Sequence, residues 1–468
     1  MSLFHSTDAA RDRADHGDVR RSARWFRERG LLPGVWRWVL LAAVIGATFV
    51  AVSKVLRRSP PPPFRSPGPV LPGDMGAGLA LKSESARSPD YFSAFVSHRT
   101  LVHAHAACVV EMADGRIRAF WYAGTDEGTQ DVTIQSAVYE RGRRQWSAER
   151  TVTGQESTEE ALFRYVKKVG NPVAVCTGDG ALWLYYVTVS VGGWSGSSIT
   201  AMVSRDHGET WSRPRRLITS PFFNQSTLVK GPAITFADGS IGLPVYHEFM
   251  GKFGELLRLD QSGRVIDKVR LSSGRSTLQP VVLVGGSERA LVLMRYAGRV
   301  PPKRVMATRT HDGGRSWTAA TKTTLSNSNT ALTGLVLPDG RILAALNDSE
   351  HSRNCLSLAL STDDGATWRM LRHIDDQSGA GPVDLEPAAY ASAIERLARA
   401  STEAPVDGPG FAESVKRQMR SANGFSFEFS YPSLIRTRDG DYHLVYTWNE
   451  AFIKHVQFSQ AWLDGLLN

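Results

Sequence analysis

Three short segments of the chain repeat one pattern, Ser/Thr-x-Asp-x-Gly-x-Ser/Thr-Trp. The three copies cover residues 204–211, 310–317 and 361–368. Their tryptophans lie 106 and 51 residues apart, close to two units and one unit of a single period. A fixed period of this size indicates stacked copies of one supersecondary unit. In each copy we expect a hairpin in which the aspartate binds turn amides, the glycine takes a positive φ and the tryptophan packs into the next layer.

A second repeat supports this interpretation. Asp-Gly dipeptides followed by apolar runs occur at Asp114, Asp179, Asp238, Asp339 and Asp439, and Gly285-Gly286 is a degenerate further copy. Asp-Gly before an alternating or apolar run is typical of a β-hairpin turn. Most of these turns lie 47 to 65 residues apart. They predict an all-β, six-bladed β-propeller of four-stranded blades over residues 88–468.

The step from Gly340 to Gly440 is 100 residues, which predicts an insertion. Residues 376–425 contain two segments of helical composition, 385–400 and 411–422, joined by a link rich in Pro and Gly. We therefore expect a helical insertion in the last blade, which either caps a substrate groove or decorates the rim.

The N-terminal region differs from the rest of the chain. Residues 1–34 are polar and of mixed charge, and we expect a disordered cytoplasmic tail. Residues 35–56 are apolar apart from Arg37 and Lys54, and predict a single transmembrane helix, with a cleaved signal peptide as the alternative. Arginines are more frequent before this span than after it, which predicts an extracytoplasmic propeller, periplasmic or extracellular. Residues 57–87 include four consecutive prolines and predict a linker.

Composition excludes some classes of partner. The formal net charge of +9 is compatible with an acidic ligand. No basic run with interleaved aromatic residues occurs, so we expect no nucleic-acid partner. Cys108, Cys176 and Cys355 are odd in number and scattered, and we expect buried thiols rather than disulfides or a metal site. The sequence indicates neither a metal nor an organic cofactor, and it leaves the oligomeric state open.

The tryptophan-ended repeats resemble the Asp-boxes of sialidase-like propellers, and the order of segments over about 96–458 resembles the sialidase superfamily. Arg295 and Arg353 stand before later Asp-boxes, where sialidases have arginines, and Tyr431 in Ser-Tyr-Pro-Ser-Leu matches the sialidase nucleophile. The resemblance implies that the arginines bind a substrate carboxylate in bidentate fashion and that Tyr431 attacks the sugar. The alternative is that the arginines form ion pairs on the rim and the tyrosine belongs to the core.

The chain also departs from the sialidase pattern. His105 stands where sialidases have the first arginine of a triad, and Gln279 lies in the region expected to hold the glutamate partner of the tyrosine. Glu248 is a substitute candidate for that partner. A closer resemblance is to the BNR-repeat "predicted neuraminidase" branch of the superfamily. It rests on motifs at 124–132, 171–173, 230–232, 429–432 and 446–455.

The resemblance implies further site residues. Asp131 and Glu127 lie in the loop where sialidases place their acid–base aspartate; we expect Asp131 to be the acid and Glu127 to hold a neighbouring residue. His105 could bind an anion or act as an acid–base group near neutral pH. Additional candidates for positive charge or proton transfer, each of which could instead be structural, are Lys230, His247 and His455.

Three functions remain open from the sequence. The first is a membrane-anchored, exo-α-sialidase-like glycoside hydrolase acting on an acidic, carboxylated glycan by a retaining mechanism, with Tyr431 as nucleophile. The second is a polysaccharide lyase, in which the arginines neutralise a uronate carboxylate and Tyr431 or His105 removes the C5 proton. Some relatives in the resembled branch look like lyases of rhamnose–uronate linkages. The third is a non-catalytic propeller that binds a glycan or a protein.

Overall fold

The computed structural model describes residues 33–56, 60–65, 89–220, 224–380, 385–401, 403, 405–418 and 425–467. The chain divides into two compact units, Met1–Pro60 and Pro61–Asn468. The first unit contains helix α2 (Pro33–Leu56). Among the described residues, no helix combines the length and the apolar character needed to cross a membrane. A helix is therefore present at 35–56, but its prediction as a transmembrane span is not supported. The predicted tail lies largely outside the described residues.

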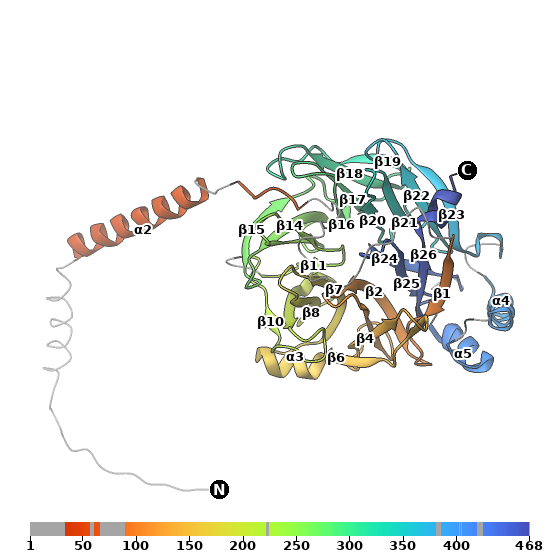
Figure 1. Ribbon diagram of the computed structural model, residues 1–468. Helices are drawn as coiled ribbons and strands as arrows, with labels where there is room; N and C mark the ends of the chain where they lie inside the picture. Colours follow the sequence, from red (N-terminus) through yellow and green to blue (C-terminus); the bar gives the residue numbers. More distant parts are fainter. Residues whose placement is uncertain are drawn as a thin grey trace, which may run out of the picture. The chain divides into compact units, whose positions relative to one another are not determined.

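The second unit is a ring of six antiparallel sheets, the blades (Figure 1). Blade 1 contains β2 (His103–Glu111), β3 (Ile117–Gly124), β4 (Thr133–Glu140), β5 (Gln145–Trp146) and β6 (Arg150–Gly154). Blade 2 contains β7 (Lys168–Cys176), β8 (Leu182–Val189), β9 (Ser197–Ser204) and β10 (Arg215–Arg216). Blade 3 contains β11 (Leu228–Val229), β12 (Ile234–Thr235), β13 (Ile241–His247), β14 (Phe253–Leu259) and β15 (Val265–Arg270).

The remaining blades follow the same order from the axis outward. Blade 4 contains β16 (Thr277–Val284), β17 (Ala290–Tyr296), β18 (Arg304–Thr310) and β19 (Thr321–Ser326). Blade 5 contains β20 (Thr333–Val336), β21 (Ile342–Leu346), β22 (Cys355–Ser361) and β23 (Arg369–Asp376). Blade 6 contains β24 (Phe429–Arg436), β25 (Tyr442–Trp448), β26 (Phe452–Phe458) and β1 (Tyr91–Phe95). Pairing of β1 with β26 closes the ring, and the predicted six-bladed propeller is confirmed.

The strand registers define two faces of the ring. Leu182 pairs with Ser204, so the first Asp-box lies at the same end of blade 2 as the Asp179-Gly180 turn. We call this end, which carries the Asp-Gly turns and the Asp-boxes, the turn face. The opposite end, where inner strands such as β2, β7, β16 and β24 begin, is the site face.

Each Asp-box is a local hairpin. The carboxylate of Asp312 accepts hydrogen bonds from the backbone N–H and the hydroxyl of Ser316, and the hydroxyl of Thr310 accepts one from the N–H of Gly314. Gly314 has a φ of +85°. These contacts are those predicted from the repeat, and they need no partner outside the hairpin.

Four inner strands share one irregularity, a β-bulge near the site face. The pairing register of β2, β7, β16 and β24 shifts where Ala106, Asn171, Gln279 and Tyr431 take left-handed φ values of 46° to 55°. Proline follows the last three of these residues. A bulge re-aims a side chain and interrupts pairing, so each of these four strands directs one residue out of the regular pleat.

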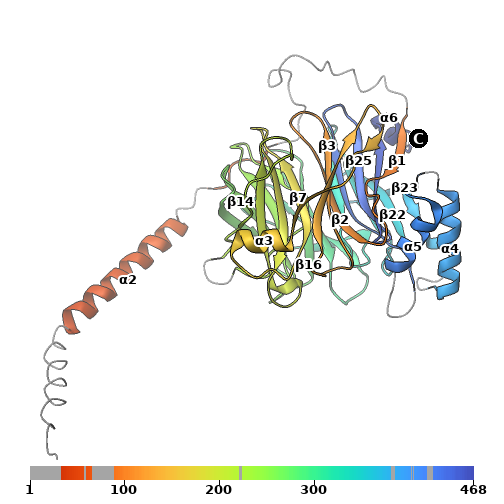
Figure 2. The ribbon, with the colours of Figure 1, turned by 90° about the horizontal axis from the view of Figure 1, so that it is seen from below.

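The described part of the insertion forms α4 (Pro387–Ala400) and α5 (Gly408–Gln418). These helices lie between β23 and β24, so they connect blades 5 and 6. The prediction of an insertion inside the last blade was therefore wrong in its position. Figures 1 and 2 show them at the outer edge of the ring, beside β1 and β23. Phe411 of α5 packs against Phe95 and Trp448 in the core. The described helices therefore cover the side of blade 6 and do not lie over the axis.

Part of the predicted linker packs on the propeller. Phe64 is 2% exposed and stacks on Phe236 with ring centroids 5.4 Å apart. Its backbone N–H donates to the carbonyl of Ser287, and its ring lies next to Gly314 of the second Asp-box. Residues 61–65 are thus held on the turn face. The remaining short elements are α3 (Gln155–Leu162), α6 (Gln460–Gly465) and the turns Trp194–Gly196 and Ser378–Ala380.

Candidate functional site

The bulged strands bring a polar cluster together at the axis on the site face. Arg295 of β17 donates through Nη1 to the hydroxyl of Tyr431 and to the side-chain oxygen of Gln279, each at 3.1 Å. The side-chain amides of Gln279 and Asn171 donate to the hydroxyl of Tyr246 at 3.5 and 3.4 Å. The sequence predicted Tyr431 and Arg295 for this site but not Gln279, Asn171 or Tyr246. The sequence signal for Gln279 and Asn171 was that each is followed by proline near the start of an inner strand, as Tyr431 is.

The two predicted arginines belong to this one cluster. Arg295 Nε donates to the side-chain oxygen of Asn329 at 2.8 Å, and Arg353 Nη2 donates to the backbone carbonyl of the same residue at 3.1 Å. Arg353 Nη1 also donates to Glu428 at 2.8 Å. Burial opposes ionisation of Glu428, but the Arg353 guanidinium and the Ser430 hydroxyl lower its pKa overall. Glu428, which the sequence did not single out, is therefore a carboxylate held by Arg353.

His105 and Lys230 lie beside the tyrosine. The His105 and Tyr431 rings have centroids 4.3 Å apart, and His105 is 5% exposed. Burial, followed by His103 and nearby cations, holds the pKa of His105 well below its usual value, so the imidazole is neutral at neutral pH. Lys230 Nζ donates to the carbonyl of Ala107 at 3.0 Å and lies 5.8 Å from the Tyr431 ring centroid. Burial lowers the pKa of Lys230 to about 8.

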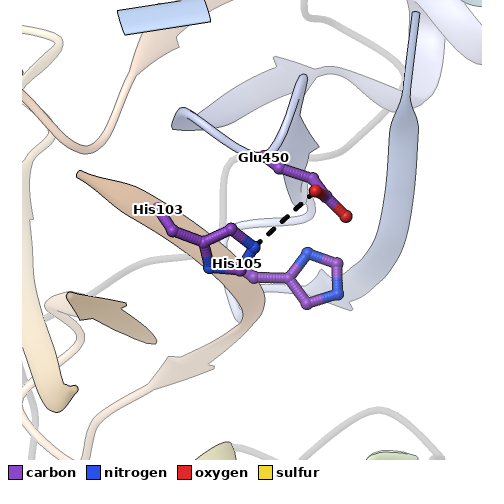
Figure 3. Close-up of side chains that lie close together, drawn as sticks. All are labelled: His103, His105 and Glu450. Atoms are coloured by element: carbon purple, nitrogen blue, oxygen red, sulfur yellow. Dashed lines mark ion pairs between the residues drawn. The ribbon is translucent and has the colours of Figure 1, made fainter. Parts of the chain in front are cut away.

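A second histidine and a glutamate adjoin His105 (Figure 3). His103 Nε2 lies 3.8 Å from the carboxylate of Glu450, which follows β25 in the turn to β26. Burial alone would lower the pKa of His103, but Glu450 raises it above its usual value. His103 and His105 are two residues apart on one strand, a spacing that puts both side chains on the same face. This spacing of two residues is the signal in the sequence that points to His103.

The loop after β3 also lies at the site face. The carboxylate of Asp131 accepts hydrogen bonds from Thr125 and Thr129, and although burial opposes this effect, these bonds lower its pKa. Asp131 is therefore held as a carboxylate, whereas the role of acid predicted for it needs a protonated carboxyl group. Glu127 accepts a hydrogen bond from Trp194 Nε1 at 2.9 Å, so it does hold a neighbouring residue. The backbone N–H of Glu248 donates to the Ser226 hydroxyl, and among the described contacts no hydrogen bond joins Glu248 to Tyr431.

Two predicted histidines lie away from the cluster. His247 Nε2 is 2.7 Å from Glu255 of the neighbouring strand β14, and its ring stacks on Phe253. His455 is buried between blades 6 and 1, where Trp146 Nε1 donates to its Nδ1 at 3.3 Å. Burial lowers the pKa of His455 to about 3. The structure thus gathers Tyr431, Arg295, Arg353, Lys230 and His105 but not these two histidines.

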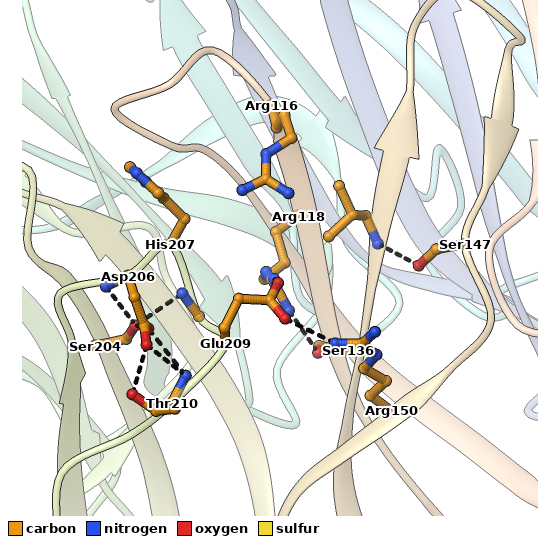
Figure 4. Close-up of polar contacts among 12 residues, drawn as sticks. Arg116, Arg118, Ser136, Ser147, Arg150, Ser204, Asp206, His207, Glu209 and Thr210 are labelled. Carbon is orange, nitrogen blue, oxygen red and sulfur yellow. Dashed lines mark hydrogen bonds and ion pairs between the residues drawn. The ribbon is translucent and has the colours of Figure 1, made fainter.

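A separate cavity of about 390 Å³ lies on the turn face and is lined by Arg118 and Arg150. Figure 4 shows these arginines beside Glu209. Both arginines are paired with Glu209 of the first Asp-box, at 2.9 and 2.7 Å. These contacts fix the Asp-box of blade 2 against blade 1. The cavity contains none of the predicted catalytic residues, so the candidate site remains the axial cluster on the site face.

Six blades, three Asp-boxes and an axial Arg–Tyr cluster define a propeller of the sialidase superfamily. The chain belongs to the family described as BNR repeat-like domain, whose model matches residues 115–444. The resemblance stated from the sequence is thereby confirmed. No curated protein matches the chain.

Solved structures share the fold at low sequence identity. A Hadza microbial sialidase superposes with a TM-score of 0.54 and 16% identity, covering 75% of this chain and 65% of that chain. An intramolecular trans-sialidase from Ruminococcus gnavus gives a TM-score of 0.54 and 11% identity, covering 77% and 95%. A Dyadobacter fermentans protein of unknown function gives 0.55 and 13%, covering 78% and 97%. The chain thus spans about two thirds of the length of the sialidase.

Proposed function

We propose that the axial cluster is the active centre of a glycoside hydrolase acting on an acidic, carboxylated glycan. The observation that carries this proposal is the 3.1 Å hydrogen bond from Arg295 to the hydroxyl of Tyr431, with Arg353 connected to the same group of residues through Asn329. Paired guanidinium groups bind a carboxylate through charge-assisted, bidentate hydrogen bonds. A carboxylate bound there would hold the sugar next to the phenol. Membership of the superfamily that includes sialidases supports the same substrate class.

In hydrolysis, the Tyr431 oxygen attacks the anomeric carbon as the glycosidic C–O bond breaks, and water later cleaves the glycosyl–tyrosine bond. Arg295 stabilises negative charge on the phenolic oxygen through its hydrogen bond. Neutral His105 is the adjacent base that can take the phenolic proton. The leaving oxygen receives its proton from an acid in the loop after β3, for which Glu127 is better suited than Asp131 because Thr125 and Thr129 hold Asp131 ionised.

One observation favours β-elimination as a second candidate. Arg295 also donates a hydrogen bond to Gln279, which lies in the region expected to hold the glutamate partner of Tyr431. A glutamine cannot act as a base, so this position offers Tyr431 no carboxylate to take its proton. In elimination the arginines neutralise a uronate carboxylate, which acidifies the C5 proton. Tyr431 or His105 takes this proton, the bond from C4 to the leaving oxygen breaks, and a 4,5-unsaturated uronate forms. A non-catalytic glycan-binding propeller remains the third possibility.

Product analysis separates these functions. The purified chain is incubated with sialylated and with uronate-containing glycans, and products are identified by mass spectrometry. Hydrolysis predicts released saturated acidic sugar, and elimination predicts products with a 4,5-unsaturated uronate. The hydrolysis product should fall by at least about a thousandfold in Tyr431→Phe, and so should the elimination product if Tyr431, rather than His105, takes the C5 proton. Tyr185→Phe is the matched control, because Tyr185 is a buried tyrosine of blade 2 outside the cluster. Absence of product from every acidic glycan would contradict the enzymatic proposal and favour a binding module.

A further inference from the structure

We propose that His103, His105 and Glu450 form a site for one divalent transition-metal ion, specifically Zn²⁺, at the edge of the axial cluster. One ligand atom from each residue lies within 4.8 Å of the other two (Figure 3). Two imidazoles and one carboxylate are a ligand set that zinc uses in proteins, with a further position left for water or a substrate oxygen. The proposal does not depend on the glycan function, because metal binding can be measured directly.

The distances suit a small contraction around an ion. Zinc–nitrogen bonds of about 2.0 Å in tetrahedral geometry place ligand atoms about 3.3 Å apart. His103 Nε2 and the nearest oxygen of Glu450 are already 3.8 Å apart. Side-chain adjustments of roughly 1 Å would complete the set. Figure 3 shows both imidazoles and the carboxylate turned toward one another.

Backbone conformation and backbone hydrogen bonds position the three ligand residues. The two histidines are two residues apart on β2, so their side chains share one face of the strand. The bulge at Ala106 follows directly after His105. Glu450 has a φ of 51° in the three-residue connection between β25 and β26, a strained conformation for a glutamate. The backbone N–H of Ala104 donates to the carbonyl of Glu450 at 2.9 Å. This bond ties the turn to the strand that carries both histidines.

The hydrogen bonding of the two histidines also suits a metal. His103 and His105 are 2% and 5% exposed, and the Nδ1 atom of each is buried without a hydrogen-bond partner among the described residues. Ligation through one ring nitrogen leaves the other as an N–H donor, so His105 would act as the base for Tyr431 only in the metal-free chain.

The surrounding charges act in both directions. The carboxylates of Glu428 and Glu127 interact electrostatically with the Glu450 carboxylate. A cation between these carboxylates would offset their mutual repulsion. Arg353, Lys230 and Arg295 act on the His105 side and oppose a cation there. We therefore expect the ion to lie on the side of His103 and Glu450.

A second set of residues needs to be distinguished from this site. Cys355, His373 and Asp376 of blade 5 also bring three ligand atoms within 4.8 Å of one another. His373 and Asp376 are exposed, and burial raises the pKa of the Cys355 thiol to about 11, which disfavours the thiolate that binds zinc. The variant Cys355→Ser removes a ligand of the second set only, so it shows which of the two sets binds the zinc.

The experiment measures metal content and affinity on the full chain. The purified protein is stripped with chelator, reloaded with Zn²⁺, dialysed and analysed by inductively coupled plasma mass spectrometry, and Zn²⁺ affinity is measured by competition with a chromophoric chelator. The variants are His103→Gln and Glu450→Gln, both close in size to the native residues. The control is His247→Gln, because His247 forms a similar His–Glu pair with Glu255 at 2.7 Å, away from the proposed site.

We expect one zinc per chain in the wild type, in His247→Gln and in Cys355→Ser, and at least about tenfold weaker binding in His103→Gln and Glu450→Gln. If His103→Gln fails to fold, Glu450→Gln carries the test, because its side chain is 28% exposed in a turn. Three results would overturn the proposal: no zinc retained by the wild type after loading, unchanged affinity in both site variants, or loss of zinc in Cys355→Ser alone.

Discussion

At the scale of single residues, the candidate site depends on side chains that the backbone holds in left-handed conformations. Tyr431 has a φ of 54° and Gln279 a φ of 49°, and each is followed by proline. A left-handed residue other than glycine costs about 1–2 kcal/mol, which the packed blade must offset. The result is that Tyr431, Gln279 and Arg295 meet at the axis within hydrogen-bonding distance.

Lys230 gives this cluster a pH dependence. Burial lowers the pKa of Lys230 to about 8, so its positive charge is lost as the pH rises above that value. We predict that kcat/KM for an acidic glycan falls about tenfold per pH unit above pH 8. Lys230→Met should lower kcat/KM at neutral pH and remove this alkaline decline. The measurement is kcat/KM from pH 6 to 10 for both proteins.

Stability measurements under the same conditions provide the control for this prediction. Because the unfolded chain still binds a proton on Lys230 between pH 8 and 10.5, this residue makes stability rise with pH in that window. A fall in kcat/KM that tracked global unfolding, or one that persisted unchanged in Lys230→Met, would contradict the role assigned to Lys230.

Five of the residues predicted for the site lie in or beside the cluster, whereas the predicted His247 and His455 lie away from it. His247 and His455 lie on second and third strands, where their side chains meet Glu255 and Trp146 of neighbouring strands or blades. The resemblance supplied residue types in chain order, but the side of the strand on which each residue lies depends on the pairing register. Gln279 and Asn171 were missed because a bulge, not the regular alternation, directs them to the axis.

At the scale of elements, the hairpins carry the fold. The Asp-box depends on residues within one turn, so its repeat predicted the blades directly. The position of α4 and α5 was less predictable. The spacing between Asp-Gly turns shows that residues are inserted, but it does not show after which strand the insertion begins. The helices proved to connect blades 5 and 6.

Glycines of the Asp-boxes test this account of the hairpin. Gly365 has a φ of +79°, and a Cβ there would meet Leu291 Cδ2 at 2.4 Å. Gly313 has a φ of +73° with nothing within 4 Å of its Cβ position. We predict a loss of about 1–2 kcal/mol in the free energy of unfolding for Gly313→Ala, from backbone strain alone. Gly365→Ala should lose a further 1–3 kcal/mol, roughly, because Leu291 must shift.

Chemical denaturation of the two glycine variants measures this difference. Equal destabilisation would show that strain alone decides both sites and that the contact with the neighbouring blade adds nothing. A smaller effect at Gly365 than at Gly313 would contradict the packing shown by the structure.

At the scale of the whole propeller, the start of β1 and the end of β26 lie on the turn face, opposite the candidate site. Tyr91 at the start of β1 pairs with Phe458 at the end of β26, and Phe458 also pairs with Tyr442, next to the Asp439-Gly440 turn. Residues 61–65 pack beside Gly314 on the same turn face. Among the described residues, 61–65, the start of β1 and the end of β26 therefore do not cover the site face.

The central claim is that the site face recognises the carboxylate of a glycan, and one comparison tests it most directly. An acidic glycan that is a substrate is compared with the same glycan after its carboxylate is reduced to a primary alcohol, and kcat/KM is measured for both. Loss of the charge-assisted hydrogen bonds predicts at least about a hundredfold lower kcat/KM for the reduced glycan.

Two arginine variants make the comparison specific. Arg295→Met should reduce the preference for the carboxylate to about tenfold or less, whereas Arg309→Met, which removes an arginine of the turn face bonded to the Asp364 carbonyl, should leave it unchanged. Equal turnover of the acidic and reduced glycans by the wild-type chain would contradict the account. A hundredfold preference that disappears only in Arg295→Met would establish that the axial cluster binds the carboxylate.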